Sequence, residues 1–171
     1  MAKKELLPII PDLDLDTLEE LSDELRRPFG MSKRDFATRD GPRNLRMARA
    51  LSQRGITLEF SGQEHGADAY WVRGSLYEEL ELKTAQEGNQ FQLWTDASRE
   101  TDTLLVRYAN TSFMFGTFRE EQLVEVFYLP VGTGLSSVFR TRLNEVRTGQ
   151  PQKRRSMSLN QVKGYGATKL V

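Results

Sequence analysis

The pattern of hydrophobic and polar residues near the N-terminus is that of an amphipathic helix. Leucines recur at every third or fourth position, a spacing that puts them on one face of a helix. Acidic residues fill the first turn, Arg26 and Arg27 lie in the last turn, and Pro28 stops the helix. We therefore predict a helix from Asp14 to Arg27, whose apolar stripe either packs into the core or pairs with a second copy of the chain. The stripe consists of Leu15, Leu18, Leu21 and Leu25.

The rest of the chain mixes helical and strand patterns, which predicts an α+β protein. Helix-compatible spacing and end signals predict three further helices, at 40–55, 102–110 and 136–147. The polar, glycine-punctuated segment 86–98 is predicted to be a loop. Alternating segments rich in β-branched and aromatic residues predict strands. These are Ile56–Phe60, Ala69–Arg73, Leu76–Ala85, Phe113–Phe118, Leu123–Leu129, Met157–Val162 and Thr168–Val171.

Length and composition narrow the classes of protein. A chain of 171 residues is one domain, large enough for a core of its own. It has no cysteine, which excludes disulfides, thiolate metal sites and cysteine nucleophiles. There is no run of 18 apolar residues and no secretory signal, so we expect a soluble, cytoplasmic protein without a membrane partner.

Charge is distributed unevenly although the formal net charge is zero. Residues 1–30 carry four basic and eight acidic residues, whereas residues 140–171 carry eight basic residues and one acidic residue. The basic C-terminal region could meet phosphates while the acidic N-terminus faces elsewhere. A solvated basic tail is the alternative interpretation.

One segment, residues 62–84, sets an acidic residue ahead of a Glu-Leu-Lys triplet. It reads GQEHGADAYWVRGSLYEELELKT and contains Asp68, Glu81 and Lys83. Because side chains alternate along a strand, Glu81 and Lys83 project to one side and the flanking leucines to the other. Carboxylate oxygens suit a hard cation such as Mg²⁺. A lysine beside the metal can stabilise charge on a phosphoryl oxygen or help to deprotonate a water. The pattern therefore indicates a metal-dependent site that cleaves phosphodiesters.

A solvated surface ion pair is the simpler interpretation of a Glu-x-Lys sequence on a strand. Two features favour a site. The strand is apolar on its second face, so it is packed on that side, and Gly66 lets the backbone turn tightly just before Asp68.

The order of elements and several local strings resemble the PvuII-type restriction endonucleases of the PD-(D/E)xK nuclease superfamily. The resemblance runs from about Arg34 to the C-terminus. It is carried by Gly55-Ile56-Thr57-Leu58, Gly62-Gln63-Glu64, Gly66-Ala67-Asp68-Ala69 and Glu81-Leu82-Lys83-Thr84, followed by LLVRYANTSFMFGTF, LVEVFYLP and a final Gly-Ala-Thr-Lys. Three departures are Ala67 in place of the usual proline, a longer hairpin after Asp68, and no histidine in segment 86–98.

The resemblance implies an α+β, single-domain, restriction-endonuclease-like fold, in which a mixed central β-sheet is flanked by helices. The single endonuclease domain would span 1–171 and act as a homodimer. Residues 1–30 would be helical and a candidate dimerisation element, 55–129 the catalytic core, and 130–171 the basic DNA-contacting region.

The resemblance also implies roles for individual residues. Asp68, Glu81 and the backbone carbonyl of Leu82 would bind Mg²⁺, and Lys83 would be the catalytic lysine. Glu64 would be an accessory acid. The role of His65, the one histidine of the chain, stays open.

The implied activity is that of a type II restriction endonuclease. It would cleave double-stranded DNA at a short palindrome, with 5′-phosphate and 3′-hydroxyl products and a cognate DNA methyltransferase in the same system. Two alternatives stay open. One is a structure-selective repair or mobile-element nuclease of the same superfamily, and the other is a non-catalytic DNA-binding module.

Amide and guanidinium side chains suit base edges, whereas other cations suit phosphates. The predicted base contacts are Asn89, Gln90, Gln92, Arg99, Gln150, Gln152 and Asn160. The predicted phosphate contacts are Arg140, Arg142, Lys153, Arg154, Arg155 and Lys163.

Overall fold

The computed structural model describes residues 15–36, 40–61 and 67–171. Its strands are β1 (Thr57–Phe60), β2 (Ala69–Arg73), β3 (Leu76–Gln86), β4 (Phe91–Trp94), β5 (Ser112–Arg119), β6 (Gln122–Leu129), β7 (Arg155–Met157) and β8 (Thr168–Lys169). Its α-helices are α1 (Leu15–Arg26), α2 (Lys33–Phe36), α3 (Gly41–Ser52), α4 (Asp102–Ala109), α5 (Gly134–Arg147) and α6 (Leu159–Gly164). Short 3₁₀ turns η1 (Arg27–Phe29) and η2 (Ala97–Arg99) follow α1 and precede α4.

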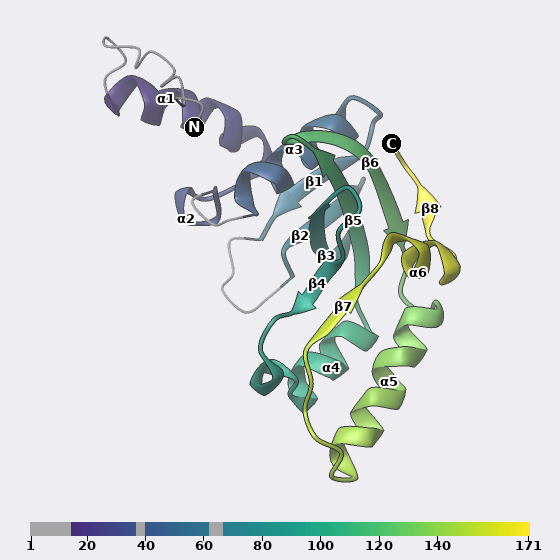
Figure 1. The fold of residues 1–171 in the computed structure, drawn as a ribbon. Helices are drawn as coiled ribbons and strands as arrows, with labels where there is room; N and C mark the ends of the chain where they lie inside the picture. The colour runs from purple at the N-terminus through teal and green to yellow at the C-terminus, as the bar shows by residue number, and fades with distance from the viewer. Residues whose placement is uncertain (1–14, 37–39, 62–66) are drawn as a thin grey trace, which may run out of the picture.

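A mixed, six-stranded sheet forms the centre of the molecule, in the order β1-β2-β3-β5-β6-β8 (Figure 1). The central pair, β3 and β5, is parallel, and the other pairs are antiparallel. A parallel pair needs a long crossover connection, which here contains β4, η2 and α4. The predicted α+β class with a mixed sheet is therefore confirmed.

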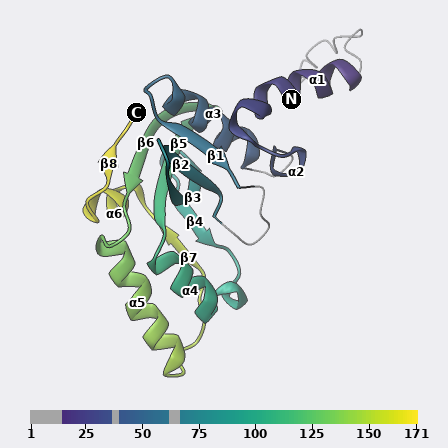
Figure 2. The same ribbon diagram turned by 180° about the vertical axis from the view of Figure 1, so that it is seen from behind.

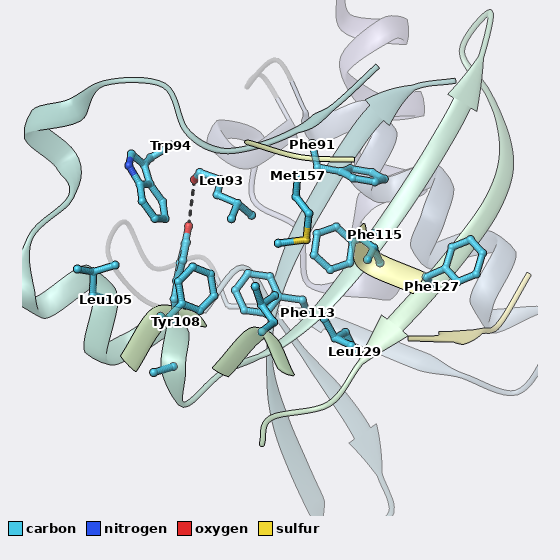
Figure 3. Close-up of a cluster of buried hydrophobic side chains, with 14 of the residues drawn as sticks. Phe91, Leu93, Trp94, Leu105, Tyr108, Phe113, Phe115, Phe127, Leu129 and Met157 are labelled. Atoms are coloured by element: carbon cyan, nitrogen blue, oxygen red, sulfur yellow. Dashed lines mark hydrogen bonds between the residues drawn. The ribbon is translucent and has the colours of Figure 1, made fainter. Parts of the chain in front are cut away.

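Two hydrophobic clusters cover the two faces of the sheet. Helix α3 packs Met47 and Leu51 on one face, against Leu80 and Leu82 of β3. Helices α4 and α5 cover the other face together with β4 and β7. Figure 3 shows this second cluster, in which the aromatic rings of β5 lie beside Tyr108 and Met157. The alternation along β3 thus sends its leucines to the α3 side and its intervening residues to the α4 side.

Helix α1 projects from the end of the molecule opposite α4 and α5 (Figures 1 and 2). Its observed span, Leu15–Arg26, agrees with the predicted helix. Leu25, the last leucine of the predicted stripe, is 41% exposed. Within the described residues, no helix is both long and apolar enough to cross a membrane.

The predicted loop at 86–98 is wrong in part, because it contains strand β4. Phe91 and Leu93 are buried on either side of the exposed Gln92, which is the alternation of a half-buried strand. Strand β4 pairs with β7, and the two make a second, two-stranded sheet. Polar residues on both sides hid this short strand in the sequence.

The predicted strand at Met157–Val162 is also wrong, because β7 ends at Met157 and α6 follows at once. The Ser158 hydroxyl accepts a hydrogen bond from the Gln161 backbone nitrogen at 3.2 Å, and Gln161 Oε1 accepts one from the Ser158 nitrogen at 2.9 Å. This capping box starts a helix where the apolar residues alone suggested a strand. The last strand, β8, is shorter than the predicted 168–171.

Candidate functional site

Asp68 and Glu81 lie on neighbouring antiparallel strands. Strand β2 pairs with β3 so that Ala69 faces Leu80. Asp68, one residue earlier, therefore falls opposite Glu81 on the same face of the sheet. The backbone closes this end of the pair, because Asp68 N donates to Leu80 O at 3.0 Å and Leu82 N donates to Asp68 Oδ2 at 2.8 Å. This register places the two carboxylates on one face at one end of the strand pair.

Glu81 is held by three side chains. Lys83 Nζ lies 2.6 Å from Glu81 Oε1, and the Tyr108 hydroxyl donates to the same oxygen at 2.6 Å. Arg107 Nη2 lies 3.2 Å from Oε2. Glu81 as a whole is only 3% exposed, so these contacts are shielded from water. Lys83 comes from the same strand, and the other two partners come from α4.

The sequence did not single out Arg107 or Tyr108 as site residues. The helical spacing predicted that Tyr108 faces inward, and it does, at 3% exposed. Its hydroxyl also lies 3.4 Å from Leu93 O, the dashed line of Figure 3. What the spacing could not reveal is that α4 packs over the face of β3 that carries Glu81.

The charges of the site shift its pKa values in different directions. Burial, together with the charge of Glu81, raises the pKa of Asp68 from 3.8 to about 6. Burial alone would raise the pKa of Glu81, but the charges of Lys83 and Arg107 hold it below its ordinary value. Despite the opposing effect of burial, Glu81 raises the pKa of Lys83. Burial raises the pKa of Tyr108 to about 12.

These shifts define the protonation states at neutral pH. Lys83 is a protonated ammonium and Tyr108 a neutral phenol that donates to Glu81. Lys83 is therefore suited to stabilise negative charge, rather than to take a proton from a water. Asp68 is the group whose charge changes near neutral pH.

The residues present fit a hard divalent cation. Two carboxylates share one face, and the pKa of Asp68 is raised in part because Glu81 repels its charge. Glu81 Oε2 is buried and, apart from the Arg107 ion pair, accepts no hydrogen bond from the described residues. Across residues 15–36, 40–61 and 67–171, no three acidic or histidine side chains converge as ligands. The Leu82 backbone carbonyl would therefore have to complete the protein ligands together with Asp68 and Glu81.

Lys83 also lines a cleft of about 640 Å³ between β3 and β4. The α3 end contributes Asp40 and Arg43, and the chain leading to α4 contributes Arg99. The walls include amides and guanidinium groups, the side chains that recognise base edges and phosphates. The full lining is Asp40, Arg43, Leu82, Lys83, Thr84, Ala85, Gln86, Asn89, Gln90, Gln92, Leu93, Trp94, Thr95 and Arg99.

The structure separates the predicted base contacts into two groups. Four of them line the cleft with Lys83: Asn89, Gln90, Gln92 and Arg99. The other three lie elsewhere. Gln150 is exposed after α5, Asn160 is exposed on α6, and the Gln152 amide donates to Glu100 O at 2.9 Å. The last contact gives Gln152 a structural role.

The placement of Arg142 argues against its predicted phosphate contact. Its side chain is 4% exposed, and its guanidinium binds the fully buried Glu100 through two hydrogen bonds of 2.7 Å. It also donates to Glu145 Oε2 at 2.7 Å and to Pro151 O at 2.5 Å. The apolar positions around Arg142 in the sequence gave no sign that Glu100 would be buried against it.

The other predicted phosphate contacts remain at the surface but not in the cleft. Lys153 and Arg155 line a separate hollow of about 290 Å³ beside α5. Arg140 and Arg154 are exposed, and Lys163 Nζ lies 4.9 Å from the centre of the Phe127 ring. The predicted accessory acid Glu64 and His65 lie outside the described residues.

Comparison with protein-family models finds no match, and comparison with curated protein sequences finds none either. What the site does must therefore be inferred from its own geometry and chemistry.

Proposed function

We propose that this protein is a Mg²⁺-dependent endonuclease that cleaves double-stranded DNA. The observation that carries the proposal is the convergence of Asp68, Glu81 and Lys83. Two facing carboxylates and a protonated lysine lie at one end of the β2–β3 pair, beside a polar cleft. These are the groups that metal-assisted phosphodiester hydrolysis needs.

The chain's own residues take separate roles in this reaction. Asp68, Glu81 and the Leu82 carbonyl hold the cation, which when bound supplies Lewis acidity that polarises a phosphoryl oxygen. Lys83 offsets the negative charge that builds up on the phosphate in the transition state. Because Glu81 lies 2.6 Å from Lys83, it also fixes the position of the ammonium group. The products would be a 5′-phosphate and a 3′-hydroxyl, as the resemblance to PvuII-type enzymes implies.

The cleft beside Lys83 supports a nucleic acid as the substrate. Asn89, Gln90 and Gln92 offer both hydrogen-bond donors and acceptors, and Arg99 offers donors for guanine or phosphate. We propose that these four residues recognise bases. We also propose that the protein has a restriction-endonuclease-like fold, which presents them to the DNA. We infer that the protein is a type II restriction endonuclease with a cognate DNA methyltransferase in the same system.

A homodimer follows from the proposed cleavage of both strands. One site of this kind cuts one strand, and a two-fold symmetric pair of sites matches a palindrome. We propose helix α1 as the dimer element, because it projects from the body and leaves Leu25 41% exposed (Figure 1). A strictly monomeric protein at micromolar concentration, with and without DNA, would contradict this assembly.

Digestion of phage and plasmid DNA with Mg²⁺ and with a chelator tests the proposed function. Discrete, reproducible fragments that require Mg²⁺ are the expected result, and sequencing their ends gives the recognition site and the stagger. Nicks or structure-selective cuts would instead indicate a repair or mobile-element nuclease. DNA binding without cleavage would indicate a non-catalytic module and would refute the proposal.

A further inference from the structure

The hairpin turn between β5 and β6 carries a carboxylate that two arginines and a glutamine surround. Arg43 Nε lies 3.2 Å from Glu121 Oε2, and Arg43 Nη2 lies 2.5 Å from Oε1. Arg46 Nη1 lies 3.3 Å from Oε2 and donates to the Glu121 backbone carbonyl at 2.7 Å. Gln86 Nε2 donates to Oε1 at 3.0 Å. Donors from α3 and β3 thus converge on one anionic group.

This arrangement is also the one that binds a phosphate. A guanidinium fork contacts two oxygens of a carboxylate or of a phosphate with the same geometry. Arg43 uses its Nε and Nη2 in this way on Glu121. A second guanidinium and an amide then surround the same oxygens. Glu121 therefore occupies the place that a phosphodiester oxygen pair could take.

The position of this cluster links it to the candidate active site. Arg43 and Gln86 both line the cleft that contains Lys83. A strand whose scissile phosphate lies at Lys83 would have further phosphates along the same cleft. Glu121 itself is 49% exposed, so its carboxylate can leave the arginines without breaking a packed core.

The backbone holds Glu121 in an unfavourable conformation. The turn has only two residues between the strands, and both have positive φ, 48° at Glu120 and 64° at Glu121. Such turns strongly favour asparagine, aspartate or glycine, because other side chains are strained there. Glutamate does not relieve this strain, so the preference of the turn does not explain why glutamates stand at these two positions. At position 121, the ion pairs of the carboxylate with Arg43 and Arg46 offer a reason for a glutamate.

We propose that Arg43, Arg46 and Gln86 form a phosphate-binding subsite that Glu121 fills in the free protein. A nucleic-acid phosphate displaces the Glu121 carboxylate when the substrate enters the cleft. That the ligand is a nucleic acid rests on the proposed function, whereas the anion subsite itself does not. The free protein thereby avoids leaving two guanidinium groups open to other anions.

Glu120 offers a matched control in the same turn. Glu120→Gln and Glu121→Gln remove the same charge from adjacent residues that both have positive φ. Among the described residues, only Glu121 of the two forms ion pairs, with Arg43 and Arg46. General electrostatic attraction therefore changes equally in the two variants, and only Glu121→Gln opens the subsite.

Calorimetric titration with inorganic phosphate tests the subsite without any cleavage assay. Glu121→Gln should bind phosphate about tenfold more tightly than the wild type and Glu120→Gln. The further change Arg43→Gln in the Glu121→Gln protein should abolish this gain. Equal affinity of the two single variants, within about twofold, would overturn the subsite.

Binding of a labelled DNA duplex without divalent metal tests the assigned ligand. Glu121→Gln should bind DNA more tightly than Glu120→Gln, and its affinity should fall more steeply with salt, by about one in the slope of log K against log salt. A gain for phosphate without a gain for DNA would overturn the assignment to nucleic acid. Because neither measurement needs hydrolysis, a failure of the proposed nuclease function would be recognised separately, by intact DNA in the presence of Mg²⁺.

Discussion

Asp68 and Glu81 lie opposite each other on neighbouring strands, but their carboxylates have different hydrogen-bond and ion-pair partners. Glu81 has two cations and a phenol around it, whereas Asp68 Oδ2 accepts a backbone hydrogen bond from Leu82 N at 2.8 Å. The difference explains why the pKa of Glu81 is lowered while that of Asp68 is raised to about 6. At neutral pH the site therefore contains a carboxylate that is costly to ionise, which a bound cation would stabilise.

The first prediction concerns stability and pH. The folded pKa of Asp68, about 6, is above its ordinary value of 3.8. Its contribution to stability is therefore present at low pH and is lost as the pH rises through about 6. Asp68→Asn keeps the acceptor for Leu82 N without the charge. It should raise the free energy of unfolding of the metal-free protein by about 1 to 3 kcal/mol at about pH 8.

Urea unfolding at several pH values measures this difference. The gain should shrink as the pH falls below about 6 and disappear by about pH 3, where Asp68 is protonated in both states. Asp102→Asn is the control, because that side chain is 49% exposed on α4. A loss of stability in Asp68→Asn at about pH 8 would contradict the raised pKa.

The second prediction concerns the phenol that supports Glu81. Tyr108→Phe removes the hydroxyl 2.6 Å from Oε1 and leaves the ring in its aromatic cluster. We expect a loss of about 1.5 to 3 kcal/mol in the free energy of unfolding, because the lost hydrogen bond has a charged acceptor. The pKa of Glu81 should rise, as seen by NMR titration of its carboxyl carbon. Tyr165→Phe, after α6, is the control and should change neither quantity. An unchanged Glu81 pKa in Tyr108→Phe would show that the Tyr108 hydroxyl does not stabilise the Glu81 carboxylate.

The third prediction separates a structural arginine from DNA contacts. Arg142→Met leaves the Glu100 carboxylate buried without its guanidinium partner. The free energy of unfolding should fall by about 3 to 5 kcal/mol. Arg147→Met on the same helix is the control, because its pair with Asp102 is exposed, and it should cost much less. If Arg142→Met kept full stability but bound DNA more weakly and with less dependence on salt, the result would support the predicted phosphate contact of Arg142 instead.

The fourth prediction concerns the basic surface. Arg154 is exposed beyond the cleft, so it is a candidate to position DNA without reading its sequence. Arg154→Gln should weaken binding to all duplexes alike and reduce the salt slope by about one. Fluorescence anisotropy with several duplex sequences measures both effects. A change in the preferred cleavage sequence would show that Arg154 reads bases.

The sequence predicted the part of the site that follows from strand alternation. Glu81 and Lys83 share a face because they are two residues apart on β3, and Asp68 joins them through the β2–β3 hairpin. It also placed Asn89, Gln90, Gln92 and Arg99 near the site, and these four line the cleft, since a polar segment right after β3 stays close to it. Contacts between distant segments were not predictable in this way.

Tyr108 illustrates why these contacts were missed. Its inward direction follows from helix periodicity, but its partner depends on how α4 crosses the sheet between β3 and β5. The Arg142–Glu100 pair is a similar case, because 42 residues separate its members. The start of α6 was missed for another reason, since the Ser158–Gln161 capping box outweighs a short apolar pattern.

Single-turnover cleavage of plasmid DNA in Mg²⁺ by Lys83→Ala, beside the wild type, tests the central claim most directly. Lys169→Ala serves as the control, because Lys169 pairs with Glu125 on β6, at the edge of the sheet. We expect Lys83→Ala to keep DNA binding and to lose cleavage by about a thousandfold or more, while Lys169→Ala cuts normally. Near-normal cutting by Lys83→Ala would contradict the assignment of the site.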